Sequence, residues 1–84
     1  MFHVYVLFSK SHKKIYIGFT SDLEGRLQAH NHPSNKGWTK NFQPWIIVYS
    51  ESYPIKSEVL VREKQLKSFK GREFIRNDIL KGQW

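Results

Sequence analysis

Two short apolar stretches at the start of the chain limit the fold more than any other feature. Residues 2–8 and 15–19 are rich in β-branched and aromatic side chains, and a polar segment with two lysines separates them. This pattern predicts a β-hairpin. Side chains alternate along a strand, so an antiparallel register with Val4 opposite Ile17 makes one face of the hairpin uniformly apolar.

The other face of the predicted hairpin carries aromatic hydroxyl groups. In the same register Tyr5 lies opposite Tyr16, and His3 lies opposite Gly18. A glycine in a strand lets another group approach the backbone closely. The hairpin alone favours ordinary cross-strand packing of the two tyrosines over a chemical role.

The composition favours a nucleic-acid partner. The chain has 84 residues, with 14 Lys and Arg against 7 Asp and Glu, which gives a net charge of +7. Such a charge is typical of nucleic-acid binding, although attachment to a ribosome or to an anionic membrane surface, or simple solubility, also accounts for it. No apolar run approaches the ~20 residues of a membrane span, and there is no signal-peptide pattern. We therefore expect one cytoplasmic domain over residues 1–84.

The absence of cysteine restricts the metal chemistry. With no thiolate available, a metal ion must bind through oxygen or imidazole, and oxygen ligands favour Mg²⁺ or Mn²⁺.

A helix is predicted directly after the hairpin. Ser21 followed by Glu24 forms a capping-box pattern. Arg26 and His30 are four residues apart, so they share one face of this helix. The helix begins where the second strand ends, and Arg26 is therefore expected to point toward the tyrosine face.

The next segment, residues 31–44, has the composition of a loop. Lysines alternate with aromatic residues in it, which suits phosphate contact and base stacking. Packing of the aromatic rings on the core is an equally good interpretation. The residues concerned are Lys36, Trp38, Lys40 and Phe42.

The remaining chain predicts one more strand and two helices. Residues 45–49 are almost continuously apolar, which favours a strand that is central or covered on both faces. A helix is expected from Ser57 to about Lys70, with Phe69 on its apolar stripe, followed by a short third helix. The order β-β-α-β-α-α predicts an α+β fold, with a small three-stranded antiparallel sheet flanked by helices.

Glu63 breaks the pattern of the predicted second helix, because its spacing turns it toward the apolar side. A carboxylate there is costly unless it is paired or binds a metal. An ion pair with a nearby Lys or Arg and a metal ligand in a cleft are both consistent with the spacing.

These residues together resemble a known family. Val4-Tyr5-Val6 is followed by Tyr16-Ile17-Gly18, so the second tyrosine comes eleven residues after the first. Arg26 comes ten residues after Tyr16. Glu63 lies in the predicted helix SEVLVREKQLKSF. This arrangement resembles the GIY-YIG nuclease signature. Nearly the whole chain is similar to small stand-alone members of the family, which are related to the N-terminal nuclease domain of excinuclease.

The resemblance implies a role for each matching residue. Glu63 would be the single protein ligand of Mg²⁺ or Mn²⁺, Tyr16 would activate water, and Arg26 would hold the scissile phosphate. Tyr5 would position the nucleophile or a metal-bound water, and His30 would assist proton transfer or contact phosphate. Together with the basic segments, the resemblance suggests nucleic-acid contacts from Lys13, Lys14, Gly18, Lys36, Trp38, Lys40, Lys67 and Lys70.

The chain also departs from the family pattern. The first tripeptide is Val-Tyr-Val, and Phe19 stands where the excinuclease has a lysine, so we expect Lys13 or Lys14 to supply the missing phosphate contact. Ile75 occupies the position of the excinuclease asparagine, with Asn77 close by.

The sequence thus predicts a metal-dependent endonuclease that hydrolyses phosphodiester bonds in DNA, with RNA left open. The alternative is a non-catalytic nucleic-acid-binding module on the same fold. A weaker one is a protein-interaction domain that docks a partner through Trp38. Substrate specificity would come from the domain itself, from a homodimer or from a protein partner.

Overall fold

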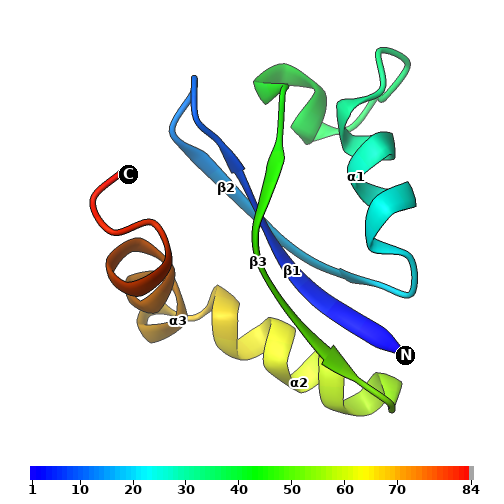
Figure 1. Ribbon diagram of the computed structural model, residues 1–84, viewed down its shortest axis with the longest axis vertical. Coiled ribbons are helices and arrows are strands. Elements are labelled where there is room, and N and C mark those ends of the chain that lie inside the picture. Colours follow the sequence, from blue (N-terminus) through cyan, green and yellow to red (C-terminus); the bar gives the residue numbers. More distant parts are fainter. Residues whose placement is uncertain (84) are drawn as a thin grey trace.

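The computed structural model describes residues 1–83, so Trp84, the last residue of the predicted domain, lies outside the described residues. Its three strands form one antiparallel sheet in the order β2-β1-β3, with helices on both faces (Figure 1). The predicted α+β class is therefore confirmed. The elements are β1 (Phe2–Ser9), β2 (Lys14–Thr20), α1 (Leu23–Asn31), the 3₁₀ helix η1 (Trp38–Phe42), β3 (Ile46–Tyr53), α2 (Lys56–Lys67), α3 (Phe69–Phe74) and the π-helical turn η2 (Ile75–Ile79).

The hairpin forms, but the predicted register is wrong by two residues. Tyr5 pairs with Gly18 instead of Tyr16, and Val4 pairs with Phe19. The turn explains the difference. If the predicted pairing continued to the tip of the hairpin, it would close with a two-residue turn at residues 10–11, and such turns favour glycine or asparagine. The chain instead forms a four-residue turn with Lys13 in the left-handed region, at φ 55°.

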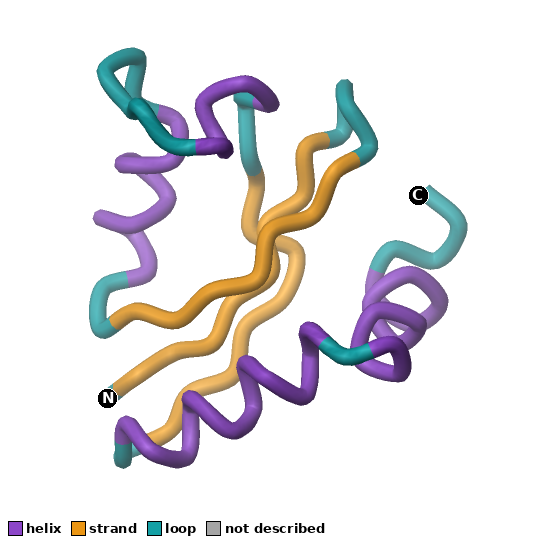
Figure 2. The backbone as a smooth tube through the Cα atoms, turned by 180° about the vertical axis from the view of Figure 1, so that it is seen from behind, coloured by secondary structure: helices purple, strands orange, loops and turns teal. Residues whose placement is uncertain are grey.

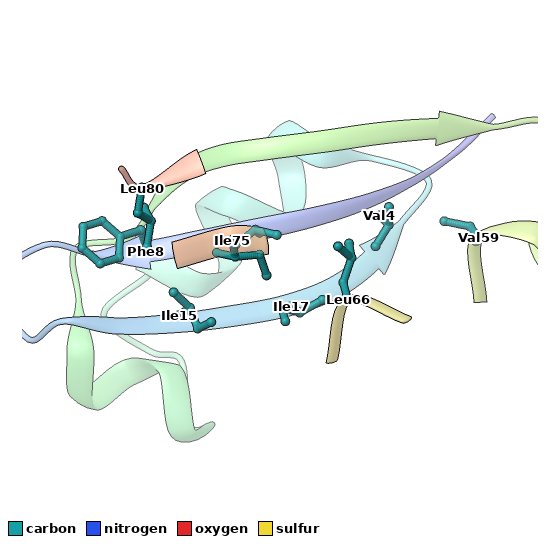
Figure 3. Packing of buried hydrophobic residues seen from close by; sticks show 9 residues of the cluster. Val4, Phe8, Ile15, Ile17, Val59, Leu66, Ile75 and Leu80 are labelled. Carbon is teal, nitrogen blue, oxygen red and sulfur yellow. The ribbon is translucent and has the colours of Figure 1, made fainter. Parts of the chain in front are cut away.

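A shift of two residues keeps every side chain on its predicted face. Val4, Val6, Ile15 and Ile17 therefore still share the apolar face. This face packs against α2, α3 and η2, and Figure 3 shows part of the resulting core. The buried members of this core are Val4, Val6, Phe8, Ile15, Ile17, Val59, Leu66, Ile75 and Leu80.

The opposite face of the sheet is covered by α1 and η1. Tyr5, Leu7 and Trp45 are buried there, and Leu27 and Phe42 pack against them. α1 and α2 consequently lie on opposite faces of the sheet (Figure 1). The predicted capping box does not form at the start of α1. Asp22 is the cap in place of Ser21, and its carboxylate accepts a hydrogen bond from the backbone N–H of Gly25 at 3.1 Å.

The third strand is at the edge of the sheet, so the first predicted alternative, a central position, is wrong. The second alternative fits the middle of the strand, because Ile47 packs on one face of the sheet and Val48 and Tyr49 pack on the other. Val6 pairs with Tyr49 but Leu7 pairs with Ile47, and the register shift leaves Val48 as an extra residue. A bulge of this kind interrupts the alternation of side chains. The continuous apolar run therefore reflects the bulge, and Ile46 at the start of the strand is exposed.

The predicted second helix divides into two. α2 ends at Lys67, and the Ser68 hydroxyl accepts a hydrogen bond from the backbone N–H of Gly71 in α3. Phe69, predicted on the apolar stripe, is 78% exposed. A Cβ on Gly71 would lie 2.2 Å from the Gln65 carbonyl oxygen, so the close packing of the two helices requires glycine. Among residues 1–83, each helix is too short or too polar to cross a lipid bilayer.

Candidate active site

A cleft of about 370 Å³ lies at the β2 edge of the sheet. Figure 2 views this edge from the front, with β2 nearest the viewer and α1 and α2 on either side. The cleft brings together side chains that are far apart in the sequence, including four of the five predicted catalytic residues and the predicted contact Gly18. It is lined by Phe2, Tyr5, Tyr16, Gly18, Phe19, Thr20, Ser21, Arg26, Lys56 and Glu63.

Glu63 reaches the cleft from α2. Its side chain is only 18% exposed, and its carboxylate lies 3.5 Å from the ammonium group of Lys67, one helical turn away. Glu63 thus forms the ion pair that one sequence interpretation predicted, and it also lies in a cleft, as the other interpretation required. Lys67 is half-exposed, and such surface pairs are weak. The carboxylate is thus available to a stronger cation.

The donor set at the cleft suits a hard divalent cation that keeps most of its water. Within residues 1–83 there is no group of three or more His, Asp or Glu side chains that could hold a metal ion. Mg²⁺ commonly binds through one or two carboxylates together with substrate phosphates. A single carboxylate in a cleft of this volume, which also contains Arg26 and Lys56, fits that mode of binding.

Tyr5 is buried and contacts His30 behind the cleft. The phenol oxygen lies 3.1 Å from Nε2 of His30. Burial, and next the neighbouring Tyr16, raise the pKa of Tyr5 well above its ordinary value of 10. Burial, and next the Arg26 guanidinium, lower the pKa of His30. Both groups are therefore neutral near pH 7.

A hydrogen-bond chain behind Tyr5 fixes the direction of its proton. The side-chain amide oxygen of Asn35 accepts a hydrogen bond from the backbone N–H of Gly37 at 2.8 Å. The NH₂ end of the same amide must therefore face Thr39. This NH₂ donates to the Thr39 hydroxyl at 2.7 Å. The hydroxyl oxygen also lies 2.9 Å from Nδ1 of His30.

We infer that the buried Thr39 hydroxyl donates to Nδ1 of His30, because its proton would otherwise lack an acceptor. His30 is then protonated on Nε2, and that N–H donates to the oxygen of Tyr5. The phenol proton of Tyr5 is consequently left to point into the cleft.

Tyr16 lies at the centre of the site. Its ring centroid is 4.7 Å from that of His30 and 6.3 Å from that of Tyr5. A Cβ at Gly18 would lie 2.7 Å from the Tyr5 hydroxyl oxygen and 3.1 Å from the Tyr16 ring. Glycine is therefore required at this position to leave room for both phenol rings.

The predicted nucleic-acid contacts fall into separate groups. Lys14, Trp38 and Lys67 line a hollow next to the cleft. Lys13 donates to the backbone carbonyl of Gln83 at 2.8 Å. The structure does not bring the other three basic residues, Lys36, Lys40 and Lys70, into the cleft or the hollow among the residues it describes.

Three neighbours of the site were not predicted from the sequence. Lys56 lines the cleft, and its ammonium group lies 5.9 Å from the centre of the Phe19 ring. Thr39 orients His30, and Arg72 lines the adjacent hollow. The sequence contained no distinctive signal for them, because each is a common residue on an element that meets β2 only in the folded chain.

Comparison with known proteins defines the class of this fold and site. The model of the GIY-YIG catalytic domain matches residues 1–76, and the chain belongs to this family, as the sequence predicted. The chain is 34% identical over 67 residues to a UPF0213 protein of Staphylococcus haemolyticus, covering 80% of each chain. It is 31% identical over 74 residues to a UPF0213 protein of Staphylococcus aureus, covering 88% of this chain and 90% of that relative. No solved structure is significantly similar to it.

Proposed function

We propose that this protein is a metal-dependent endonuclease that hydrolyses phosphodiester bonds in DNA. The observation that carries the proposal is that Tyr16, Arg26 and Glu63 line one cleft, although they come from β2, α1 and α2. Phosphodiester hydrolysis needs an activated water and neutralisation of charge on the phosphate. The cleft offers a phenol, a guanidinium and a carboxylate for these tasks.

The cations of the cleft would bind the scissile phosphate. A guanidinium matches phosphate geometry with two parallel hydrogen bonds and stays charged at all relevant pH values. Arg26 supplies this group, and Lys56 supplies a second positive charge beside Phe19. Lys56 thus takes the place that the sequence assigned to Lys13 or Lys14.

The two tyrosines would divide the work. Tyr5 stays protonated, and its hydroxyl can donate to a phosphate oxygen or orient the attacking water. Tyr16 would act as its phenolate beside Arg26 in the same cleft, and it would become the neutral phenol as it accepts the proton of that water. Glu63 would hold Mg²⁺ or Mn²⁺, which supplies Lewis-acid stabilisation of charge on the phosphate and the leaving oxygen.

The Glu63–Lys67 ion pair keeps a second candidate function open, namely a non-catalytic nucleic-acid-binding module. Such a module would use Lys67 to neutralise Glu63 permanently. The position of Glu63 in the same cleft as both tyrosines favours the nuclease.

The test is cleavage of single-stranded, nicked, branched and plain duplex DNA by purified protein, with Mg²⁺, with Mn²⁺ and with EDTA. Glu63→Gln and Tyr16→Phe are each expected to lower cleavage at least about 100-fold. Glu58→Gln on the same helix is the matched control and should cleave like the wild type. A parallel RNA panel identifies the sugar preference.

Two outcomes contradict the proposal. Cleavage that persists in EDTA or in Glu63→Gln would remove the metal-dependent mechanism. Tight, salt-sensitive DNA binding without cleavage on any substrate would favour the binding module.

A further inference from the structure

A second hollow of about 380 Å³ lies next to the cleft and is strongly basic. Three cationic side chains and two aromatic rings contribute to it, and its lining contains no carboxylate within the described part of the chain. The residues used below are Lys14, Tyr16, Trp38, Lys67 and Arg72.

The hollow and the cleft follow one another along the free edge of β2. Strand residues 14–17 line the hollow, residues 16 and 18–20 line the cleft, and Tyr16 belongs to both. The Glu63–Lys67 ion pair also joins them, because Glu63 faces the cleft and Lys67 faces the hollow. In Figure 2 this edge lies in the foreground between the helices of the two faces. A polymer that lies along β2 would therefore pass through both.

Trp38 has the properties of a rigid stacking platform. Its ring is held by Phe42 at 4.7 Å and by the buried Trp45 at 5.9 Å between ring centroids. The Trp45 indole N–H donates in turn to the Thr39 carbonyl at 2.7 Å. Trp38 is nevertheless 51% exposed, so about half of this packed side chain is open to solvent.

The chemistry around this ring is that of a nucleotide site. Lys14, Lys67 and Arg72 provide positive charge for phosphate groups, and the indole provides a surface for a base. A base within a duplex is covered on both faces by its neighbours, so only an unpaired base can stack on a protein side chain.

We propose that the hollow binds an unpaired nucleotide next to the scissile phosphate, with its base stacked on Trp38 and its phosphate held by Lys14, Lys67 and Arg72. The place of the scissile phosphate rests on the proposed function of the cleft. The preferred substrate is accordingly DNA that is single-stranded beside the cut.

The test measures binding in EDTA, so that it does not depend on cleavage. Fluorescence anisotropy of a labelled 20-nucleotide single strand is compared with that of the blunt duplex of the same sequence. We expect the wild type to bind the single strand more tightly than the duplex. Trp38→Ala should weaken single-strand binding roughly 5- to 150-fold, the range measured for loss of one stacked base, and should change duplex binding less than twofold.

Two further variants keep the test valid if Trp38→Ala loosens the packing around Trp45. Trp38→Phe retains a flat aromatic surface and should bind the single strand within about threefold of the wild type. Lys14→Gln should lower the slope of log affinity against log salt by about 0.7, the value for one phosphate contact on a single strand. Lys10→Gln, in the same hairpin but outside the hollow, is the matched control and should leave the slope unchanged.

The results separate this inference from the proposed function. Equal single-strand binding by Trp38→Ala and the wild type, or equal losses on the single strand and the duplex, would overturn the nucleotide site even if Glu63-dependent cleavage is observed. The expected binding pattern without any cleavage would support the site while the nuclease proposal fails.

Discussion

Replacement of Thr39 by valine is the sharpest test of the hydrogen-bond chain behind Tyr5. Valine keeps the shape of threonine but removes the hydroxyl, which lies 2.9 Å from Nδ1 of His30 and 2.7 Å from the Asn35 amide nitrogen. Asn35 retains a second acceptor, the His30 carbonyl oxygen at 3.2 Å. The variant therefore leaves one buried group, Nδ1 of His30, without a partner.

An unpaired buried polar group costs about 1–3 kcal/mol. We expect Thr39→Val to lower the free energy of unfolding by about 2 kcal/mol, which corresponds to about 10 °C in Tm for a domain of this size. Thr39→Ser keeps the hydroxyl and loses one buried methyl group, so its cost should be about 1 kcal/mol. Urea unfolding monitored by circular dichroism measures both values.

Stability alone does not separate the hydroxyl from ordinary packing, so the second readout is the protonation of the His30 ring. Long-range ¹H–¹⁵N correlation spectra of the imidazole should show a proton on Nε2 in the wild type and in Thr39→Ser. Thr39→Val should lose this preference, because nothing then donates to Nδ1. A proton on Nδ1 in the wild type, or a valine variant with unchanged stability and an unchanged spectrum, would refute the proposed direction of the chain.

Three other substitutions test separate parts of the structure. Gly18→Ala should lower the free energy of unfolding by about 1–3 kcal/mol and lower cleavage about 100-fold, because the added Cβ displaces the Tyr5 ring. Full cleavage at unchanged stability would contradict this reasoning. Lys56→Gln should lower cleavage about 10- to 100-fold and change Tm little, since it removes one charged phosphate contact, and cleavage at the wild-type rate would exclude that contact. Glu51→Gln should remove about 1–2 kcal/mol of stability at pH 6 and progressively less toward pH 2, measured by urea unfolding across that range, and a difference independent of pH would count against it. Partial burial alone would raise the pKa of Glu51, but hydrogen bonds from Arg62, Tyr49 and Tyr53 lower this pKa to about 2. The stabilisation by the ionised carboxylate is therefore fully present above the ordinary pKa of 4.5 and is lost as the pH falls toward 2. Solvent screening reduces its magnitude.

The sheet illustrates what can and cannot be read from the sequence. The faces of the hairpin were predictable because the two-residue period of a strand survives a register shift of two. The register itself depended on the turn, and Lys13 in the left-handed region has no simple sequence signal. The bulge at Val48 also had no sequence signal, and it explains why the prediction of a central third strand failed. The irregular pairing gives this edge strand a continuous apolar run that resembles that of a central strand.

The candidate site was predictable where its parts are close in sequence. The hairpin leads directly into α1, and this connection brings Arg26 toward the tyrosines. Glu63 depended on the family resemblance, because its spacing allowed an ion pair equally well. Thr39 and Lys56 meet the site through contacts between distant segments, and such contacts follow from the packing of the whole chain.

The free edge of β2 connects the fold with the proposed function. An edge strand presents unpaired backbone groups that readily pair with another chain, and proteins commonly protect such edges with charged side chains. Here Lys14 lies at the start of the strand, and Arg26, Lys56 and Lys67 flank it from α1 and α2. The repulsion between two such edges opposes strand pairing, while the same positive charge attracts a phosphate backbone. The basic residues that prevent β2 from pairing with a strand of another molecule are therefore the same residues whose charge the proposed substrate would neutralise. The basic surface and the unpaired edge strand thus depend on one set of side chains.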